Sequence, residues 1–422
     1  MVSEQTPDDG TSGVEAEGVA SVEADAADRI DADATIDLLR ELVRIPSPFF
    51  EEAEIADYIH DWLDARGLDP EYHRVSEPDI TGFEGDNVVA RVEGTDPDAP
   101  TVLLNGHMDT VQHVEGWTED PTSGRIEDGK LYGQGACDMK GGLAAILVAF
   151  EALAAGDYRG DVVLTAVVDE EGPFGLGTDA LIRDGVVDDC DIAVVTEPAP
   201  MITQGDIENP ALVLGARGRF LYEITVTGTA AHGSQPERGV NAALDAARLA
   251  AAIDEMDLGR HPKLGSGSTC LLSIEGGGEP LSVPDRCTLE IDRHVVPGET
   301  AVSVLADARR VADRLDLDSE VDISLRETPD PDMYFQPYVT DETHPLVAPF
   351  FESVRTRRGV DPDVGYFSSI GDFNHLGGRA GIPTVIAGPD GANVHGTGEY
   401  VLVDEVVETA RLVADATRRI IE

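Results

Sequence analysis

Three short runs of apolar residues are the clearest pattern in the first half of the chain. They cover residues 101–106, 161–168 and 191–196. Val, Ile and Leu dominate the runs, as in strands buried on both faces of a sheet. Each run stops at side chains that bind metals or carry protons: His107, Asp169-Glu170-Glu171 and Glu197. Because the carboxyl ends of neighbouring strands meet at one edge of an α/β sheet, we expect these side chains to lie together.

Two more candidate ligands lie elsewhere in the chain. Asp138 precedes an apolar, helix-like stretch at 139–153, which places its carboxylate at a helix start. His395 follows a late strand-like run at 383–389. Imidazole and carboxylate are the usual zinc ligands, and two ions about 3.5–4 Å apart can share a bridging carboxylate and a water. The set therefore indicates a two-metal hydrolytic site.

Residues 214–335 follow a different pattern. Strand-like stretches at 218–228, 268–275, 287–295 and 320–326 are interleaved with helix-like stretches at 240–253 and 300–315. The order β-α-β-β-α-β is the ferredoxin-like one. We therefore predict an inserted α+β domain at 214–335 and a discontinuous catalytic domain formed by 30–213 and 336–422.

Several motifs, taken in order, resemble the family of acetylornithine deacetylase, succinyl-diaminopimelate desuccinylase, aminoacylase and glutamate-releasing carboxypeptidases. The resemblance runs from about residue 31 to residue 422. The motifs are GHMDTV (106–111), GQGACDMKGG (133–142), VDEEGPFG (168–175), VVTEP (194–198), GTAAHGSQPERGVNAA (228–243), DRHVVPGE (292–299) and VHGTGEYV (394–401). The family implies an α/β fold: a mixed-sheet metallohydrolase domain with helices on both faces, plus an inserted ferredoxin-like lid or dimerisation domain.

The resemblance also implies roles for the candidate ligands. Asp138 would bridge two metal ions, His107 and Glu197 would hold one, and Glu171 and His395 would hold the other. Glu170 would then be the general base. Adjacent residues leaving a strand point in different directions, which fits one ligand and one base. Asp109, two residues after His107, would orient that imidazole without binding metal.

Residues of the inserted domain are implied to complete the site. His232 matches a histidine that stabilises the oxyanion, in dimeric members from the neighbouring subunit; the simpler interpretation is a turn histidine. Arg293 matches a position that contacts the substrate α-carboxylate, and a strand-end surface arginine is its alternative. Arg217 and Asn241 are further candidates for the same pocket.

The function implied is metal-assisted hydrolysis of an acyl–amino bond by a metal-bridging hydroxide, with Zn²⁺ as the expected metal and Co²⁺ as the alternative. Glu rather than Asp at position 197 favours an N-acyl amino acid substrate, such as N-acetylornithine or an N-succinyl derivative. A dipeptidase or carboxypeptidase, a non-catalytic metal-binding relative and an acyl-transferring enzyme remain open.

The net charge of the chain indicates the ionic environment and the partners to expect. The formal net charge is −52 over 422 residues, with 82 acidic and 30 basic groups. The lysines are Lys130, Lys140 and Lys263 alone. Because such a chain repels itself until salt screens it, we predict a halophilic enzyme, with a merely acidic mesophilic one as the alternative. Nucleic acid and anionic membranes are excluded as partners; a small substrate and a homodimer through the lid are expected.

The amino end and the apolar stretches bear on location. Residues 1–29 are rich in Asp, Glu, Ala and Gly, and are predicted to be an acidic disordered tail. They lack the positive region and apolar core of a signal peptide. The most apolar stretch, 143–155, is too short to span a membrane. We therefore expect a cytoplasmic protein.

Overall fold

The computed structural model describes residues 25–198, 207–330 and 332–422. Its larger part is built on a nine-stranded mixed sheet in the order β1-β2-β6-β3-β7-β17-β8-β15, with β16 paired to β8. The central pairs β6–β3, β3–β7 and β7–β17 are parallel. The strands are β1 (Glu71–Glu77), β2 (Phe83–Val92), β3 (Thr101–His107), β6 (Asp161–Val167), β7 (Ile192–Val195), β8 (Ala211–Ala216), β15 (Tyr338–Val339), β16 (Asp363–Phe367) and β17 (Thr384–Ile386).

Helices cover both faces of this sheet. They are needed because alternate apolar side chains of the central strands project to opposite faces, and both faces must be buried. In β3, Val102 and Leu104 pack into one hydrophobic cluster, while Leu103 packs into the other. The first cluster lies under α1 (Ala32–Arg44), α2 (Ala53–Asp64), α3 (Gly141–Ala154), α7 (Ala348–Arg358) and α9 (Val403–Ile421). The second lies under α4 (Leu176–Arg183), α8 (Asp372–Asn374) and the turn η5 (His375–Arg379). The predicted α/β class is confirmed.

A smaller sheet of four strands lies beside the edge of the large sheet at which the candidate metal ligands are expected. Its order is β18-β19-β5-β4. It brings the chain near residue 395 back to the segment before α3. The strands are β4 (Arg125–Glu127), β5 (Lys130–Tyr132), β18 (Gly391–Ala392) and β19 (Tyr400–Leu402).

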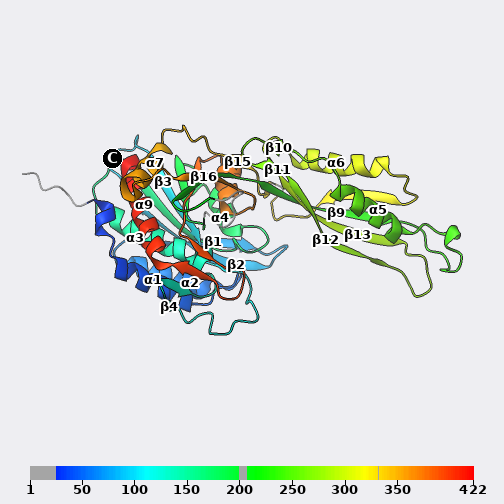
Figure 1. The fold of residues 1–422 in the computed structure, drawn as a ribbon, viewed down its shortest axis with the longest axis horizontal. Coiled ribbons are helices and arrows are strands. Elements are labelled where there is room, and N and C mark those ends of the chain that lie inside the picture. Colours follow the sequence, from blue (N-terminus) through cyan, green and yellow to red (C-terminus); the bar gives the residue numbers. More distant parts are fainter. Residues whose placement is uncertain (1–24, 199–206, 331) are drawn as a thin grey trace, which may run out of the picture.

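The inserted domain, residues 218–325, has its own antiparallel sheet and core. The sheet order β12-β13-β9-β14 is that of a ferredoxin-like fold. Two helices cover one face around Tyr222, Leu249 and Leu289. Figure 1 shows this domain projecting to the right of the catalytic part. Its elements are β9 (Gly218–Thr227), η4 (Pro236–Arg238), α5 (Ala242–Asp254), β10 (Arg260–His261), β11 (Gly265–Ser266), β12 (Ser268–Gly277), β13 (Arg286–Val295), α6 (Ala301–Arg314) and β14 (Glu320–Leu325).

Two predicted boundaries are shifted by the structure. The chain changes sheets at Arg217, so residues 214–216, assigned to the insert, are the end of β8. Residues 25–29, assigned to the disordered tail, include the short helix η1 (Ala26–Arg29), in which Ala26 and Ala27 are buried. The Arg29 guanidinium donates to the carbonyl of Ala152 at 3.1 Å, which holds this turn on α3. The rest of the predicted tail, 1–24, lies outside the described residues.

None of the helices in the described ranges is long and apolar enough to cross a membrane.

Candidate active site

Three neighbouring parallel strands bring the first candidate ligands to one edge of the large sheet. His107 is the last residue of β3 and lies opposite Val167, the last residue of β6. On the other side, β7 pairs with β3 as far as Asn105 and Val195. Glu170 and Glu171 therefore follow one neighbour of His107, and Glu197 follows the other. The predicted convergence of strand ends is what the structure shows.

Asp138 and His395 complete the cluster. His107 Nε2 lies 3.2 Å from Asp138 Oδ1 and 3.4 Å from Glu197 Oε1. His395 Nε2 lies 3.3 Å from Asp138 Oδ2 and 2.8 Å from Glu171 Oε1. The two oxygens of Asp138 thus face two different histidines, each of which has a glutamate of its own. This is the arrangement that a carboxylate shared by two metal ions requires.

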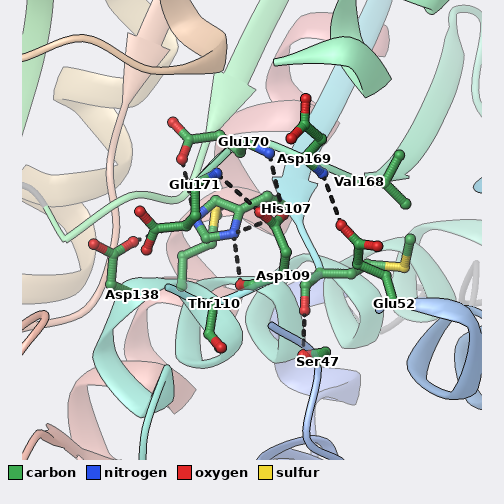
Figure 2. A network of polar contacts seen from close by, with 12 residues as sticks. Ser47, Glu52, His107, Asp109, Thr110, Asp138, Val168, Asp169, Glu170 and Glu171 are labelled. Atoms are coloured by element: carbon green, nitrogen blue, oxygen red, sulfur yellow. Dashed lines mark hydrogen bonds and ion pairs between the residues drawn. The ribbon is translucent and has the colours of Figure 1, made fainter. Parts of the chain in front are cut away.

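Glu170 lies in the same cluster but farther from the imidazole. Its Oε2 is 3.8 Å from His107 Nε2, beyond hydrogen-bond distance. Figure 2 shows Glu170 and Glu171 leaving the same turn beside His107. Two sets of side chains each bring three potential ligand atoms within 4.8 Å of one another. One set is His107, Asp138 and Glu171, and the other is His107, Glu170 and Glu197. Glu170 and Glu171 therefore both lie close enough to bind a metal ion. Proximity alone does not decide which of them is the ligand and which is the base.

Burial makes this a strongly coupled charge cluster. His107 is fully buried, and Asp138 and Glu197 are nearly so. Burial raises the pKa of Glu171 to about 7 and that of Glu197 to about 8, and it raises the pKa of Glu170 well above its usual range. Burial opposes ionisation of Asp138 too, but hydrogen bonds from His107 and His395 outweigh it and lower its pKa. Divalent cations would relieve the same repulsion, so the donor set fits metal ions.

Asp109 fixes the backbone of the two adjacent glutamates. Its carboxylate accepts the backbone N–H of Glu170 at 3.2 Å and that of Glu171 at 2.8 Å. His107 Nδ1 lies 3.0 Å from the Asp109 carbonyl and 3.5 Å from its carboxylate. The expected partner of the imidazole N–H was the carboxylate. In the structure the nearer acceptor is the backbone oxygen, and the carboxylate, which also lies beside the imidazole, binds the backbone of the two glutamates as well.

Glu399 was not among the predicted site residues. It is buried, and its carboxylate accepts the backbone N–H groups of Gly135 (2.8 Å), Cys137 (2.9 Å) and Asp138 (3.1 Å). These groups belong to the turn η2 (Ala136–Lys140) and its approach, so Glu399 fixes the segment that presents Asp138. Its sequence signals are its position four residues after His395 and its place in the VHGTGEYV motif, where the resemblance implies a glutamate near the metal histidine that is not a ligand.

His232 and Asn241 lie far from the cluster within one chain. β9 starts at the junction of the two domains and spans ten residues, which is about 30 Å of strand. His232 follows its far end and is exposed, with Ser234 Oγ 2.8 Å from its Nδ1. Asn241 caps α5 by accepting the N–H of Leu244 at 3.0 Å. A single chain therefore does not bring these residues to the metal ligands.

Arg293 and Arg217 are also held by contacts inside the protein. Arg293 is fully buried on the helix-covered face of β13, and its guanidinium lies 2.6 Å from Glu299 Oε1. This placement does not support the predicted contact with substrate, because the side chain that β13 turns to the open face is the next one, His294. Arg217 is nearly buried at the sheet junction, where its Nε donates to the carbonyl of Leu264 at 3.2 Å.

Comparison with known proteins gives one family. The family model described as Peptidase family M20/M25/M40 matches residues 103–419. N-formyl-4-amino-5-aminomethyl-2-methylpyrimidine deformylase from Bacillus subtilis is 29% identical over 359 residues, covering 79% of this chain and 83% of the relative. Succinyl-diaminopimelate desuccinylase from Methylobacterium radiotolerans is 27% identical over 384 residues, covering 88% of this chain and 93% of the relative.

Solved structures support the same fold. Aminopeptidase PepT from Bacillus cereus matches with a TM-score of 0.74 at 22% identity, covering 93% of this chain and 100% of that one. The Bacillus subtilis protein YxeP, described as a dinuclear metal binding peptidase from the M20 family, matches with a TM-score of 0.69 at 15% identity, covering 92% of this chain and 98% of that one.

Proposed function

The chain belongs to peptidase family M20/M25/M40 and is a hydrolase of amide bonds, and from that premise we propose that it cleaves the acyl–amino bond of an N-acyl amino acid at a two-metal site. The observation that carries the proposal is the position of Asp138. Its two oxygens face His107 and His395, which have Glu197 and Glu171 as their respective partners.

These five residues would hold the two ions. His107 and Glu197 would bind one, His395 and Glu171 the other, and Asp138 both. Imidazole and carboxylate donors suit Zn²⁺, and Co²⁺ is the alternative. When bound, such ions polarise the scissile carbonyl and lower the pKa of a water toward about 7.

Glu170 would supply the proton transfer. Its carboxylate is close to the cluster, and the N–H of its own residue is fixed on Asp109. A base held in this way can take the proton of the attacking water and later give it to the leaving amine. The raised pKa of Glu170, which results from burial and from the neighbouring carboxylates, suits both steps.

His232 would stabilise the oxyanion from a second copy of the chain. The distal position of His232 supports this assignment, because its own cluster lies at the other end of β9. Apolar side chains for a dimer contact are exposed on the edge strand β12 and on α5: Leu271, Leu272, Ile274 and Leu244.

Complementation tests this arrangement. His232→Ala should lower kcat about 10²–10³-fold with both metals retained, as for the loss of one oxyanion donor. Mixing this variant with Glu170→Gln should restore part of the activity, because a mixed dimer has one site with both groups intact. If the mixture stays as inactive as its components, His232 does not act across a dimer.

The proposed substrate class is based on the reactions of similar proteins. A deformylase and a desuccinylase are among the relatives, and both names describe removal of a small acyl group from nitrogen. Glu at position 197 favours the same class. We therefore propose a small N-acyl amino acid such as an N-acetyl or N-succinyl derivative, in place of a dipeptide.

The decisive experiment measures amine release from N-acetyl, N-succinyl and dipeptide substrates in molar KCl. The enzyme is stripped of metal and reloaded with Zn²⁺ or Co²⁺, and Asp138→Asn serves as the metal-site control. Metal-dependent release from one acyl class, absent in the control, is the expected result. Release from dipeptides alone would favour the peptidase alternative, and a folded, metal-loaded but silent enzyme would contradict hydrolysis of these amides.

We also propose that the enzyme works in a salt-rich cytoplasm. The three lysines support this reading of the charge, because none is a freely exposed cation. Lys140 is buried, with its ammonium 2.7 Å from the carbonyl of Ile45. Lys130 lies over the ring of Tyr400, and Lys263 is 3.7 Å from Glu342.

A further inference from the structure

The turn that carries Glu170 and Glu171 is held by an unusual set of contacts. Four consecutive backbone N–H groups, from Val168 to Glu171, are each bound by the side chain of a residue remote in sequence. Val168 donates to Asn87 Oδ1 at 3.1 Å, and Asp169 donates to Glu52 Oε1 at 3.1 Å. The last two donate to Asp109, as described above. These four N–H groups of the β6–α4 turn are thus bound by acceptors from three other segments.

We propose that Glu52 is a positioning residue that sets the direction of the Glu170 carboxylate. It stands at the start of α2, is 3% exposed, and its Oε1 accepts two backbone N–H groups, those of Phe50 at 2.9 Å and Asp169 at 3.1 Å. It does not contact the metal ligands; it acts through the backbone of the residue before Glu170. Figure 2 shows Glu52 reaching Asp169 from the side opposite His107. The inference rests on the proposed role of Glu170 as base.

The conformation of Asp169 explains why an external acceptor is needed. Its φ is +60°, in the left-handed region, which few non-glycine residues adopt and which Asp tolerates when its side chain bonds locally. One oxygen of its own carboxylate, Oδ2, accepts the N–H of Leu176 at 3.1 Å and closes the turn onto α4. The turn is so tight that a Cβ on Gly172 would lie 1.7 Å from Asp169 Oδ1. A backbone in this state points Glu170 correctly only while its N–H groups stay anchored.

Without Glu52, the Asp169 N–H would lose its acceptor inside the protein. A buried donor without a partner is unfavourable, so the backbone would rotate to find another acceptor. Because Asp169 directly precedes Glu170, such a rotation would also move the base. A displacement of the base by about 1 Å is enough to lower turnover about 10²-fold, while groups that bind substrate stay in place. The expected signature is therefore a loss in kcat with little change in KM.

The test compares Glu52→Ala and Glu52→Gln with the neighbour Glu51→Ala, whose side chain is exposed. Glu52→Ala should lower kcat by about 10²-fold, leave KM within about twofold, and retain two metals per chain. Glu52→Gln keeps an acceptor oxygen and should recover most of kcat; Glu51→Ala should behave as wild type. Should the alanine variant fail to fold, Glu52→Asp, which withdraws the carboxylate by one methylene, takes its place with the same expectation.

Hydrogen exchange separates this inference from the proposed reaction. Amides 168–171 should exchange faster in Glu52→Ala than in Glu51→Ala, whatever the substrate of the enzyme. An inactive wild type would refute the proposed function but leave this measurement decisive. The inference is overturned if exchange at 168–171 is the same in both variants, or if kcat falls equally in Glu52→Gln and Glu52→Ala.

Discussion

Replacing Glu170 by Gln tests the division of labour between the adjacent glutamates most directly. The amide has nearly the shape of the carboxylate, so the buried turn and its contacts with Asp109 should persist. It cannot accept the proton of a water. The side chain lies 3.8 Å from His107 Nε2, whereas the proposed ligands lie 2.8–3.4 Å from their histidines.

The expected fall in kcat follows from the loss of the general base while all the proposed metal ligands are retained. Removing a general base costs about 10²–10⁴ in rate, which is about 3–5 kcal/mol in the activation free energy. Both histidines and three carboxylates remain to hold metal, so the metal content should stay at two per chain. We therefore expect kcat to fall at least 100-fold with an unchanged metal content.

The assay combines amine release with metal analysis, and Glu171→Gln is the matched control. Glu171 Oε1 is 2.8 Å from His395 Nε2, so its loss should release the metal ion that His395 is proposed to bind. The reasoning is refuted if Glu170→Gln is the variant that loses an ion while Glu171→Gln retains both. That result would exchange the roles of the two residues.

Three further predictions concern stability. Removing metal with a chelator should lower the melting temperature, because free metal at about 100 times its Kd stabilises the fold by about 2.7 kcal/mol per site; an unchanged melting curve would argue against a metal bound to the native state. Dilution from molar to about 0.1 M KCl lengthens the screening distance from about 3 Å to about 10 Å, so far-ultraviolet circular dichroism should show unfolding, and full folding and activity in dilute buffer would contradict the halophilic reading. Burial lowers the pKa of His375 to about 4, so the unfolded chain binds the extra proton first as pH falls. Stability should therefore be lost from about pH 6.5 down to about pH 4, and His375→Gln should reduce that slope by up to one proton in denaturant titrations, whereas an equal slope would show that this histidine does not contribute.

Strand positions and the clustering of the candidate metal ligands could be predicted because each has a local signal. The run 101–106 with His107 became β3 without a shift, and the β-α-β-β-α-β pattern gave the inserted sheet to within a few residues. Buried parallel strands require continuous apolar runs, and their ends determine where ligands meet. These physical constraints are visible in a single sequence.

Arg293 was expected to contact the substrate, but its side chain is buried inside the inserted domain. Cys287, Leu289 and Ile291 alternate along the strand, so Arg293 falls on the same buried face by the two-residue period. That signal was present, but the motif led to the opposite expectation. His294, on the open face, has its Nδ1 3.1 Å from the carbonyl of Ser368, across the domain junction.

Other features had no local signal at all. Glu52 is one acid among 82, and nothing in the neighbouring residues distinguishes a buried acceptor from a solvated charge. The distance between His232 and the metal ligands depends on how the inserted domain projects, which no pattern in the strands encodes. Such properties arise from tertiary packing.

The interleaving of the large sheet dictates an order of assembly during synthesis. β17 lies between β7 and β8, so the sheet stays split until residues 384–386 have left the ribosome. The inserted domain, whose strands are contiguous in sequence, can fold earlier as a unit. His395 emerges later still. The nascent chain must therefore hold two half-sheets unjoined until β17 is available, and the cluster of candidate ligands is complete only once His395 has followed.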